Sequence, residues 1–276
     1  MRTYYPVLSI AGSDCSGGAG IQADIKTMSA IGCYAMSVIS SITAQNTTGV
    51  RSIMAVSPEI VADQIDMVFD DIPPLAVKIG MLCNAGVAKA VADRLARYRP
   101  DKLIVDPVMV STSGSMLLEK EAVEVLVNEI FPLALLVTPN QMETRALTGE
   151  TDPQRQIARL REMGCGNILI KGGDTDRTDV KTDLLYLSDS GETVELKADA
   201  VETANTHGTG CTLSSAIASY LALGYGLSDA VGMAKLYVTR ALREGAWITT
   251  GKGHGPVNHF FSPRRLKNFN PKKPSN

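Results

Sequence analysis

The chain has 276 residues, of which 45% are apolar, and this suits one large α/β domain with a full hydrophobic core. A net charge of −2 and an isoelectric point of about 6.0 provide no basic surface for nucleic acid or an anionic membrane. No apolar run reaches the roughly 18 residues of a membrane span, and the apolar stretch near the N-terminus is too short for a secretion signal. We therefore expect a cytoplasmic protein that binds neither nucleic acid nor membrane.

The cysteines and histidines argue against a disulfide framework, a zinc site and a histidine-rich metal centre. The five cysteines include no Cys-x-x-Cys pair, and the three histidines include no His-x-x-x-His pair. This pattern indicates free thiols in a reducing compartment and disfavours a zinc site.

Apolar runs of strand length alternate with helical patterns along almost the whole chain. In chain order, strands are predicted at residues 7–11, 37–44, 77–80, 103–106, 135–138, 167–171 and 183–187. Helices are predicted at residues 20–31, 59–70, 86–98, 121–130, 142–147, 154–163 and 211–223. Residues 184–187 and 193–196 flank a turn at 188–191 and predict a hairpin.

Continuous apolar strands separated by helices predict a three-layer α/β fold, with a central, mainly parallel sheet flanked by helices. Ligands of such folds bind beyond the carboxyl ends of the strands, and polar residues follow several predicted strands there. One domain is predicted over residues 1–262. Residues 263–276, rich in Lys, Arg, Pro and Asn, are predicted to be a basic, disordered tail.

Two glycine motifs point to nucleotide folds that the rest of the chain excludes. Residues 18–23 match the Gly-x-Gly-x-x-Ala form of a dinucleotide fingerprint, but residues 38–46 lack the acidic residue that would hold the ribose. Gly251-Lys252 is followed by Gly253, where a P-loop needs Ser or Thr. Neither a Rossmann dehydrogenase nor a P-loop protein is predicted.

Residues 205–211, Asn-Thr-His-Gly-Thr-Gly-Cys, lie where a loop gives way to the predicted helix at 211–223. The glycines let the amides of Gly208, Thr209 and Gly210 turn toward one point, and the helix start adds its positive dipole end. This predicts a phosphoryl site with the Cys211 thiol at its rim. A helix N-terminus lowers a thiol pKa from about 8.5, so a Cys211 thiolate is predicted to accept a proton, although bound phosphate disfavours a second anion nearby.

Two further strand ends carry phosphate-site and metal-site candidates. Lys171 offers a cation beside two glycines, with a solvated surface lysine as the alternative. Asn140 is either a helix N-cap or, with Glu143, part of a site for hydrated Mg²⁺. Asp24 and Asp106 are additional polar candidates, whose alternative is a structural role in capping a helix or ordering a strand end.

These motifs together resemble the hydroxymethylpyrimidine/phosphomethylpyrimidine kinase family, in collinear order over residues 7–261. The segments that carry the resemblance are 11–14, 16–24, 43–47, 78–82, 106–109, 138–140, 171–173, 205–211 and 255–260. The resemblance implies a ribokinase-like fold. It also implies ATP-dependent phosphorylation, with Mg²⁺, of a pyrimidine alcohol and then of its monophosphate on the way to thiamine.

The resemblance also implies site residues. For the substrate ring these are Gly12, Thr43, Gln45, Met81 and Val108. For ATP they are Asn140, Lys171 and Thr206, and for the metal Glu143 and Asp106. The carboxamide of Gln45 can form hydrogen bonds with both the donor and the neighbouring acceptor of an aminopyrimidine. For Met81 and Val108, the alternative to contact with the substrate ring is packing in the hydrophobic core.

Other functions stay open at this point. A vitamin B6 kinase of the same family differs only in its ring substrate, and a flap expected at Ser111–Thr112 lacks the second cysteine of some B6-active relatives. A non-catalytic ligand-binding protein on the same fold is a remote alternative, because the phosphate-binding residues are all present. A homodimer formed through a sheet edge is also open.

Overall fold

The computed structural model describes residues 2–109, 118–173 and 179–271. Its main sheet has eight strands in the order β11-β10-β9-β8-β7-β6-β2-β3. Along the sheet from β3 to β9 the strands run parallel, and β10 and β11 add antiparallel pairs at one edge. The predicted mainly parallel sheet is therefore confirmed. The strands are β2 (Pro6–Ala11), β3 (Tyr34–Ile39), β6 (Ala76–Ile79), β7 (Leu103–Val105), β8 (Leu136–Val137), β9 (Asn167–Ile170), β10 (Val180–Tyr186) and β11 (Thr193–Asp199).

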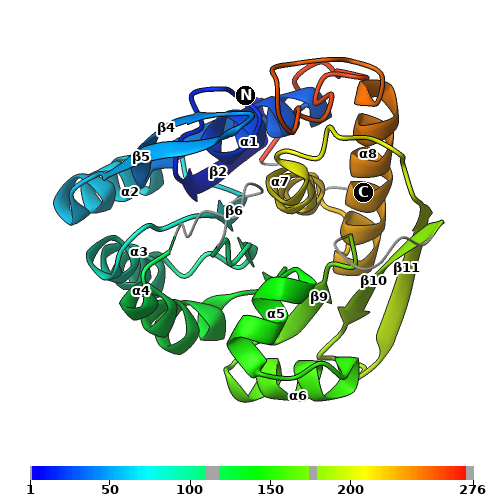
Figure 1. Cartoon of the computed structure of the whole chain (residues 1–276). Coiled ribbons are helices and arrows are strands. Elements are labelled where there is room, and N and C mark those ends of the chain that lie inside the picture. The colour runs from blue at the N-terminus through cyan, green and yellow to red at the C-terminus, as the bar shows by residue number, and fades with distance from the viewer. Residues whose placement is uncertain (1, 110–117, 174–178, 272–276) are drawn as a thin grey trace.

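Helices cover both faces of this sheet (Figure 1). One face packs against α2 (Pro58–Asp71), α3 (Ala85–Tyr98), α4 (Lys120–Val125) and α6 (Pro153–Glu162), with α5 (Gln141–Thr148) against α6. The other face packs against α1 (Gly20–Ile31), α7 (Thr209–Ala222) and α8 (Leu227–Gly245). Because both faces are covered, β2 and β6 are buried along their whole length. In the described ranges, no helix has the length and apolar character of a membrane span.

The residues of the predicted strand at 37–44 belong to two strands and not to one, because the chain bends at Ser40. Strand β3 ends at Ile39, and β4 (Ser41–Asn46) leaves the sheet to pair with β5 (Gly49–Ala55) as a separate hairpin. The Ser40 amide donates to the Ala11 carbonyl at 3.0 Å, and its hydroxyl donates to the Met81 carbonyl at 2.6 Å. These contacts fix the bend and project the hairpin from the carboxyl edge of the sheet.

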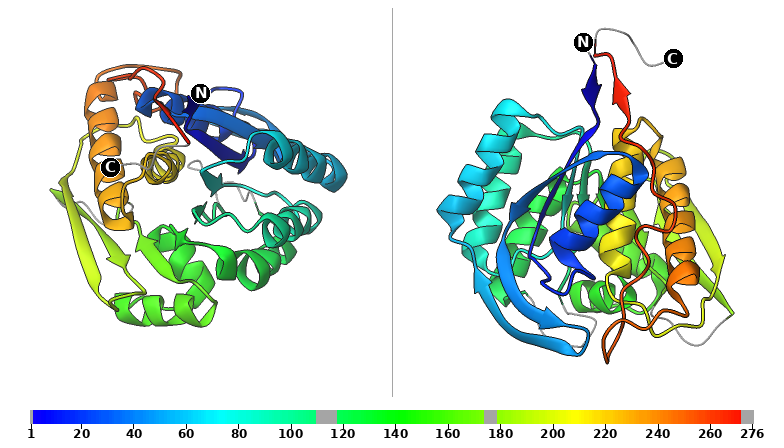
Figure 2. Two further views of the ribbon diagram at one scale, coloured as in Figure 1. Left: turned by 180° about the vertical axis from the view of Figure 1, so that it is seen from behind. Right: turned by 90° about the horizontal axis from the view of Figure 1, so that it is seen from above.

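The prediction of a disordered tail is wrong for residues 264–269. The amides of Arg264 and Lys267 donate to carbonyls at the C-terminal end of α1, at 2.9 and 2.8 Å. Strand β12 (Asn268–Phe269) pairs antiparallel with β1 (Thr3–Tyr4), so segments near the two ends of the chain lie side by side (Figure 2). The basic side chains remain largely exposed while the backbone of this segment is docked.

Candidate active site

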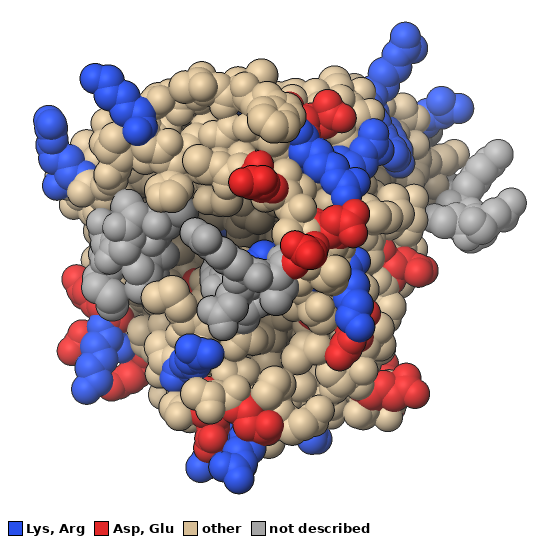
Figure 3. All heavy atoms as spheres, turned by 45° about the vertical axis from the view of Figure 1, so that its right-hand side comes forward, with Lys and Arg blue, Asp and Glu red and all other residues tan. Residues whose placement is uncertain are grey.

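A cavity of about 750 Å³ opens at the carboxyl edge of the sheet, beside the first turn of α7. It brings together every residue that the sequence analysis assigned to catalysis, substrate, nucleotide or metal. These are Gly12, Thr43, Gln45, Met81, Asp106, Val108, Asn140, Glu143, Lys171, Thr206, Gly208, Thr209, Gly210 and Cys211. Figure 3 shows one face of the molecule hollowed near its centre, with acidic and basic side chains interspersed around the hollow.

Gly208 is the N-cap of α7 and has a φ of 80°, in the left-handed region that favours glycine. A Cβ at this position would lie 1.8 Å from the carbonyl oxygen of Gly18, so the two glycine-rich loops are in direct contact. No side chain caps α7, and its first-turn amides therefore have no partner within the helix. Among them, the Thr209 amide donates to the Thr206 carbonyl of the preceding turn at 3.2 Å. The residues that carry these amides line the cavity, which fits an anion site.

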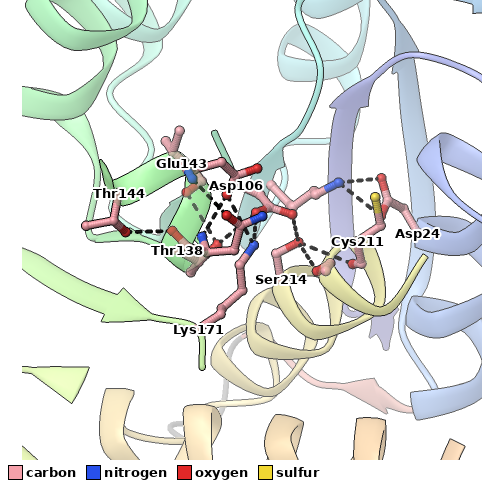
Figure 4. Close-up of polar contacts among 12 residues, drawn as sticks. Asp24, Asp106, Thr138, Glu143, Thr144, Lys171, Cys211 and Ser214 are labelled. Carbon is pink, nitrogen blue, oxygen red and sulfur yellow. Dashed lines mark hydrogen bonds and ion pairs between the residues drawn. The ribbon is translucent and has the colours of Figure 1, made fainter. Parts of the chain in front are cut away.

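The Lys171 ammonium lies against this helix start. Its Nζ is 2.6 Å from Asp106 Oδ1 and 3.8 Å from Glu143 Oε2 (Figure 4). A Cβ on Gly210 would lie 3.4 Å from the same nitrogen. Burial lowers the pKa of Lys171, but Asp106 and Glu143 outweigh this effect and hold the pKa above its usual range. The structure therefore places a permanent positive charge beside the amides of α7.

The start of α5 shows what Asn140 and Glu143 contact. Asn140 Oδ1 accepts from the Glu143 amide at 2.8 Å, and Glu143 Oε2 accepts from the Asn140 amide at 2.7 Å, which is a capping box. The N-cap interpretation of Asn140 is thus confirmed. Asp106 and Glu143 also place two carboxylates near one ammonium. Within the described ranges no three His, Cys, Asp or Glu side chains are grouped so that they could hold a metal ion, and a Mg²⁺ site at Glu143 and Asp106 stays a prediction.

Asp24 belongs to a buried ion pair with Lys78, a lysine that the sequence analysis did not assign. Lys78 Nζ lies 2.9 and 3.1 Å from the two carboxylate oxygens, and both side chains are 0% exposed. Ser9 and Ser215 donate to the same carboxylate at 2.5 and 2.6 Å. The structural alternative for Asp24 is therefore correct, since its carboxylate joins β2, β6, α1 and α7 beneath the cavity.

The expected lowering of the Cys211 pKa is wrong for this state of the protein. Burial raises the pKa of the Cys211 thiol to about 11, and the nearby carboxylates of Asp24 and Asp106 also raise it. The Lys78 ammonium and a hydrogen bond from the Gly20 amide lower this pKa but do not outweigh the burial. Cys211 is consequently a neutral thiol at pH 7. Its role as proton acceptor stays a prediction.

The residues predicted for the substrate ring line one end of the cavity. A Cβ on Gly12 would lie 2.6 Å from Ser41 Oγ and 3.2 Å from Met81 Cε, so glycine leaves room for a flat ligand there. Met81 is buried and Val108 is partly exposed, which allows both to contact a ring face. The predicted flap at Ser111–Thr112 lies outside the described residues.

The other end of the cavity is lined by residues that the sequence analysis missed. Its apolar walls include Ala146, Val201, Leu213, Val238 and Leu242. Next to them, Lys235 Nζ lies 2.7 Å from Asp183 Oδ2. An apolar slot with few polar groups suits a flat heteroaromatic base. Two of the walls come from α8, a helix whose apolar repeat of small residues the sequence analysis overlooked.

Comparison with known proteins identifies the family. A family model described as phosphomethylpyrimidine kinase matches residues 14–258. The chain belongs to this family. It is 48% identical to the hydroxymethylpyrimidine/phosphomethylpyrimidine kinase of Rhizobium meliloti over 259 residues, covering 92% of this chain and 96% of that protein. It is 46% identical to the thiamine biosynthesis bifunctional protein ThiED of Geobacter sulfurreducens, covering 95% of this chain but only 53% of that longer protein.

Solved structures agree with this assignment. The crystal structure of phosphomethylpyrimidine kinase from Clostridium difficile has a TM-score of 0.74 at 45% identity, covering 86% of this chain and 99% of that one. An ADP complex of Bacillus subtilis pyridoxal kinase has a TM-score of 0.84 at 29% identity, covering 93% and 98%. The chain is therefore an ATP-dependent kinase with a ribokinase-like fold.

Proposed function

We propose that this kinase transfers the γ-phosphoryl group of ATP to the hydroxymethyl group of 4-amino-5-hydroxymethyl-2-methylpyrimidine and then phosphorylates the monophosphate, in thiamine biosynthesis. The observation that carries the proposal is the arrangement of the cavity. An uncapped helix start and the Lys171 ammonium lie between an apolar slot at one end and the ring residues at the other. Relatives that are 42% and 48% identical and named for both pyrimidine substrates support the ring assignment.

The transfer step needs positioning and charge stabilisation more than covalent chemistry. The substrate hydroxyl oxygen bonds to the γ-phosphorus, the bond to the bridging oxygen of ADP breaks, and the hydroxyl proton passes to the thiolate form of Cys211. The amides of Gly208, Thr209 and Gly210 stabilise the charge on the transferring group. Lys171 supplies a fixed positive charge next to the same position.

Asp106 and Glu143 are the residues that would hold Mg²⁺, through water as well as directly. The ion neutralises phosphate charge when bound. Asn140 keeps the Glu143 carboxylate in place through the capping box, and Lys171 orients Asp106 at 2.6 Å. Thr206, which precedes the helix start in the same loop, is proposed to contact the nucleotide phosphates.

A vitamin B6 kinase is the second candidate, favoured by the TM-score of 0.84 to pyridoxal kinases. The two functions are separated by measuring ADP release with the pyrimidine alcohol, its monophosphate, pyridoxal and pyridoxine. We expect kcat/KM for the pyrimidine alcohol to exceed that for either B6 compound by at least about tenfold, a difference of about 1.4 kcal/mol in transition-state stabilisation. A higher kcat/KM for pyridoxal would replace the proposed substrate, and no ADP release with any of the four would refute the kinase itself.

A homodimer and a cytoplasmic location stay predictions. The β4–β5 hairpin leaves Ile42 and Met54 47% and 62% exposed, and contact between two copies would cover them. Light scattering coupled to gel filtration measures the mass directly, and the mass of one chain at all concentrations would exclude the dimer.

A further inference from the structure

His207 and Asp14 form a contact between loops that lie 193 residues apart, and the sequence analysis gave neither residue a role. Asp14 is 1% exposed, and its carboxylate accepts hydrogen bonds from the amides of Ser16, Gly18 and Ala19 at 2.8–3.1 Å. His207 Nε2 lies 2.8 Å from Asp14 Oδ2. Both residues line the cavity.

The negative charge of Asp14 shows which atom carries the proton in the hydrogen bond between His207 Nε2 and Asp14 Oδ2. Burial raises the pKa of Asp14, but hydrogen bonds from His207, Ser16 and Ala19 outweigh this effect and hold the pKa far below its usual range. An ionised carboxylate only accepts hydrogen bonds. The proton between the two side chains is therefore on His207 Nε2, which is a donor whether the ring is neutral or charged.

The His207 ring is held rigidly in this position. Its side chain belongs to a residue that is 6% exposed, and a Cβ on Gly18 would lie 2.4 Å from its Cδ2 atom. The His207 amide donates to the Gly255 carbonyl at 3.0 Å. Gly255, in one of the segments that carry the family resemblance, thus holds the backbone of His207 in place.

The same Nε2 faces the carboxamide of Gln45, the residue proposed to recognise the substrate ring. The Gln45 amide nitrogen lies 3.4 Å from His207 Nε2, and the amide oxygen lies 3.3 Å from Thr43 Oγ1. In this orientation two donors face each other. In addition, the single hydroxyl proton of Thr43 is already donated to the Ser13 carbonyl at 2.7 Å.

A half-turn of the Gln45 amide removes both conflicts. Oxygen and nitrogen of a carboxamide are assigned from the hydrogen-bond network, because the two orientations have the same shape. After the half-turn, the single Nε2–H of His207, whose main acceptor is Asp14 Oδ2 at 2.8 Å, is shared with Gln45 Oε1 as a second and more distant acceptor, and Gln45 Nε2 donates to Thr43 Oγ1. These contacts use one donor and one acceptor of the amide and leave one of each for a ligand.

We infer that His207, held by Asp14, is a positioning residue that locks the Gln45 carboxamide in the orientation that matches an aminopyrimidine. The inference rests on the proposed function. The free amide N–H of Gln45 pairs with a ring nitrogen, and its free oxygen lone pair accepts from the neighbouring exocyclic amino group. A ring without an adjacent acceptor and donor cannot use both groups, so the locked amide selects among ring substrates.

A double-mutant cycle between His207 and Gln45 tests the inference. His207→Leu should raise KM for the pyrimidine alcohol about tenfold and leave KM for ATP and kcat within about threefold, as expected for a lost hydrogen-bond alignment. His207→Gln, which can place a donor near the same point, should stay within about threefold of the wild type. In a Gln45→Leu background, His207→Leu should change KM less than about twofold, because the group it orients is absent.

Other outcomes separate this inference from the proposed function. Equal KM effects of His207→Leu in both backgrounds, or an effect mainly on ATP, would mean that His207 only supports the Gly208 loop, and the inference would be wrong. If His207→Leu fails to fold, His207→Asn replaces it, since its shorter side chain cannot reach Gln45 and the same KM effects are expected. Wild-type enzyme that does not turn over the pyrimidine alcohol would overturn both, whereas normal turnover with additive mutant effects would overturn the inference alone.

Discussion

Replacing Lys78 by methionine would leave the Asp24 carboxylate buried without its counter-charge. Methionine is close to lysine in length and keeps most of its packing, so the change is mainly electrostatic. Lys78 Nζ lies 2.9 and 3.1 Å from the carboxylate oxygens, and both side chains are fully buried. At about 3 Å and an effective dielectric constant of about 20, the attraction is about 5 kcal/mol. Removal of one partner of a buried pair typically destabilises a protein by about 3–5 kcal/mol.

This loss should be visible as a lower melting temperature. An unfolding entropy of about 2.1 cal/mol/K per residue gives roughly 0.6 kcal/mol/K for 276 residues. The Lys78→Met variant should therefore melt about 5–9 °C below the wild type in a thermal shift assay or calorimeter. The hydroxyls of Ser9 and Ser215 still donate hydrogen bonds to the Asp24 carboxylate in this variant. We therefore expect the fall in melting temperature not to exceed this range.

The matched control removes the charge of Asp24 as well. The asparagine of an Asp24→Asn/Lys78→Met variant is neutral and can still accept from one of the two serines, so the double variant should recover more than half of the lost stability. Melting temperatures that fall additively in the double variant would refute the electrostatic argument. So would a Lys78→Met variant that melts within about 1 °C of the wild type.

Three further predictions follow from the site and its supports. Gly208→Ala should reduce kcat at least about 100-fold and should destabilise the protein more than the control Gly149→Ala. Both positions have a positive φ, but only at Gly208 would a Cβ clash with another part of the backbone. Equal melting temperatures of the two variants would contradict this prediction. The rate at which iodoacetamide alkylates Cys211, followed by peptide mass spectrometry, should rise about tenfold per pH unit from pH 7 to 10. The reason is the thiol pKa of about 11, which keeps Cys211 mostly neutral below that pH. A rate that levels off near pH 8 would show that Cys211 has an ordinary thiol pKa. Truncation after residue 262 should lower the melting temperature by several degrees, whereas truncation after residue 271 keeps the β1–β12 pairing and should not.

The central sheet could be predicted because its strands are buried on both faces and therefore consist of continuous apolar residues. The break at Ser40 could not, because β-branched residues, which favour strands, lie on both sides of it and the bend is fixed by carbonyls of Ala11 and Met81, far away along the chain. The docked C-terminal segment was missed for a similar reason. Its contacts are backbone hydrogen bonds and a short strand pair, and neither leaves a trace in a composition rich in Lys and Arg.

The candidate site was predicted more completely than the groups that support it. Glycines and polar residues at strand ends mark the phosphate loop, and every residue assigned to the site lines one cavity. Lys78 did carry a signal, as a lone charge inside an apolar strand, but its partner Asp24 lies 54 residues away. The pKa of Cys211 was predicted in the wrong direction, because the helix start was weighed and the burial of the thiol was not.

The charge of Cys211 connects the anion site to the buried ion pair. With a pKa of about 11, about one thiol in 10⁴ is ionised at pH 7. A neutral thiol does not repel a phosphate held by the amides of Gly208–Gly210, whereas a permanent thiolate would. Lys78 lowers the pKa of Cys211, so it is the cation that stabilises the thiolate form that would accept the substrate proton. The Asp24→Asn/Lys78→Met variant loses the lowering of this pKa by Lys78 and the smaller raising by Asp24, so the pKa rises on balance. With most of its stability recovered, the variant should therefore have a lower kcat at pH 7 and a rise of kcat with pH that extends to higher pH. If its kcat equals that of the wild type, the ion pair serves stability alone.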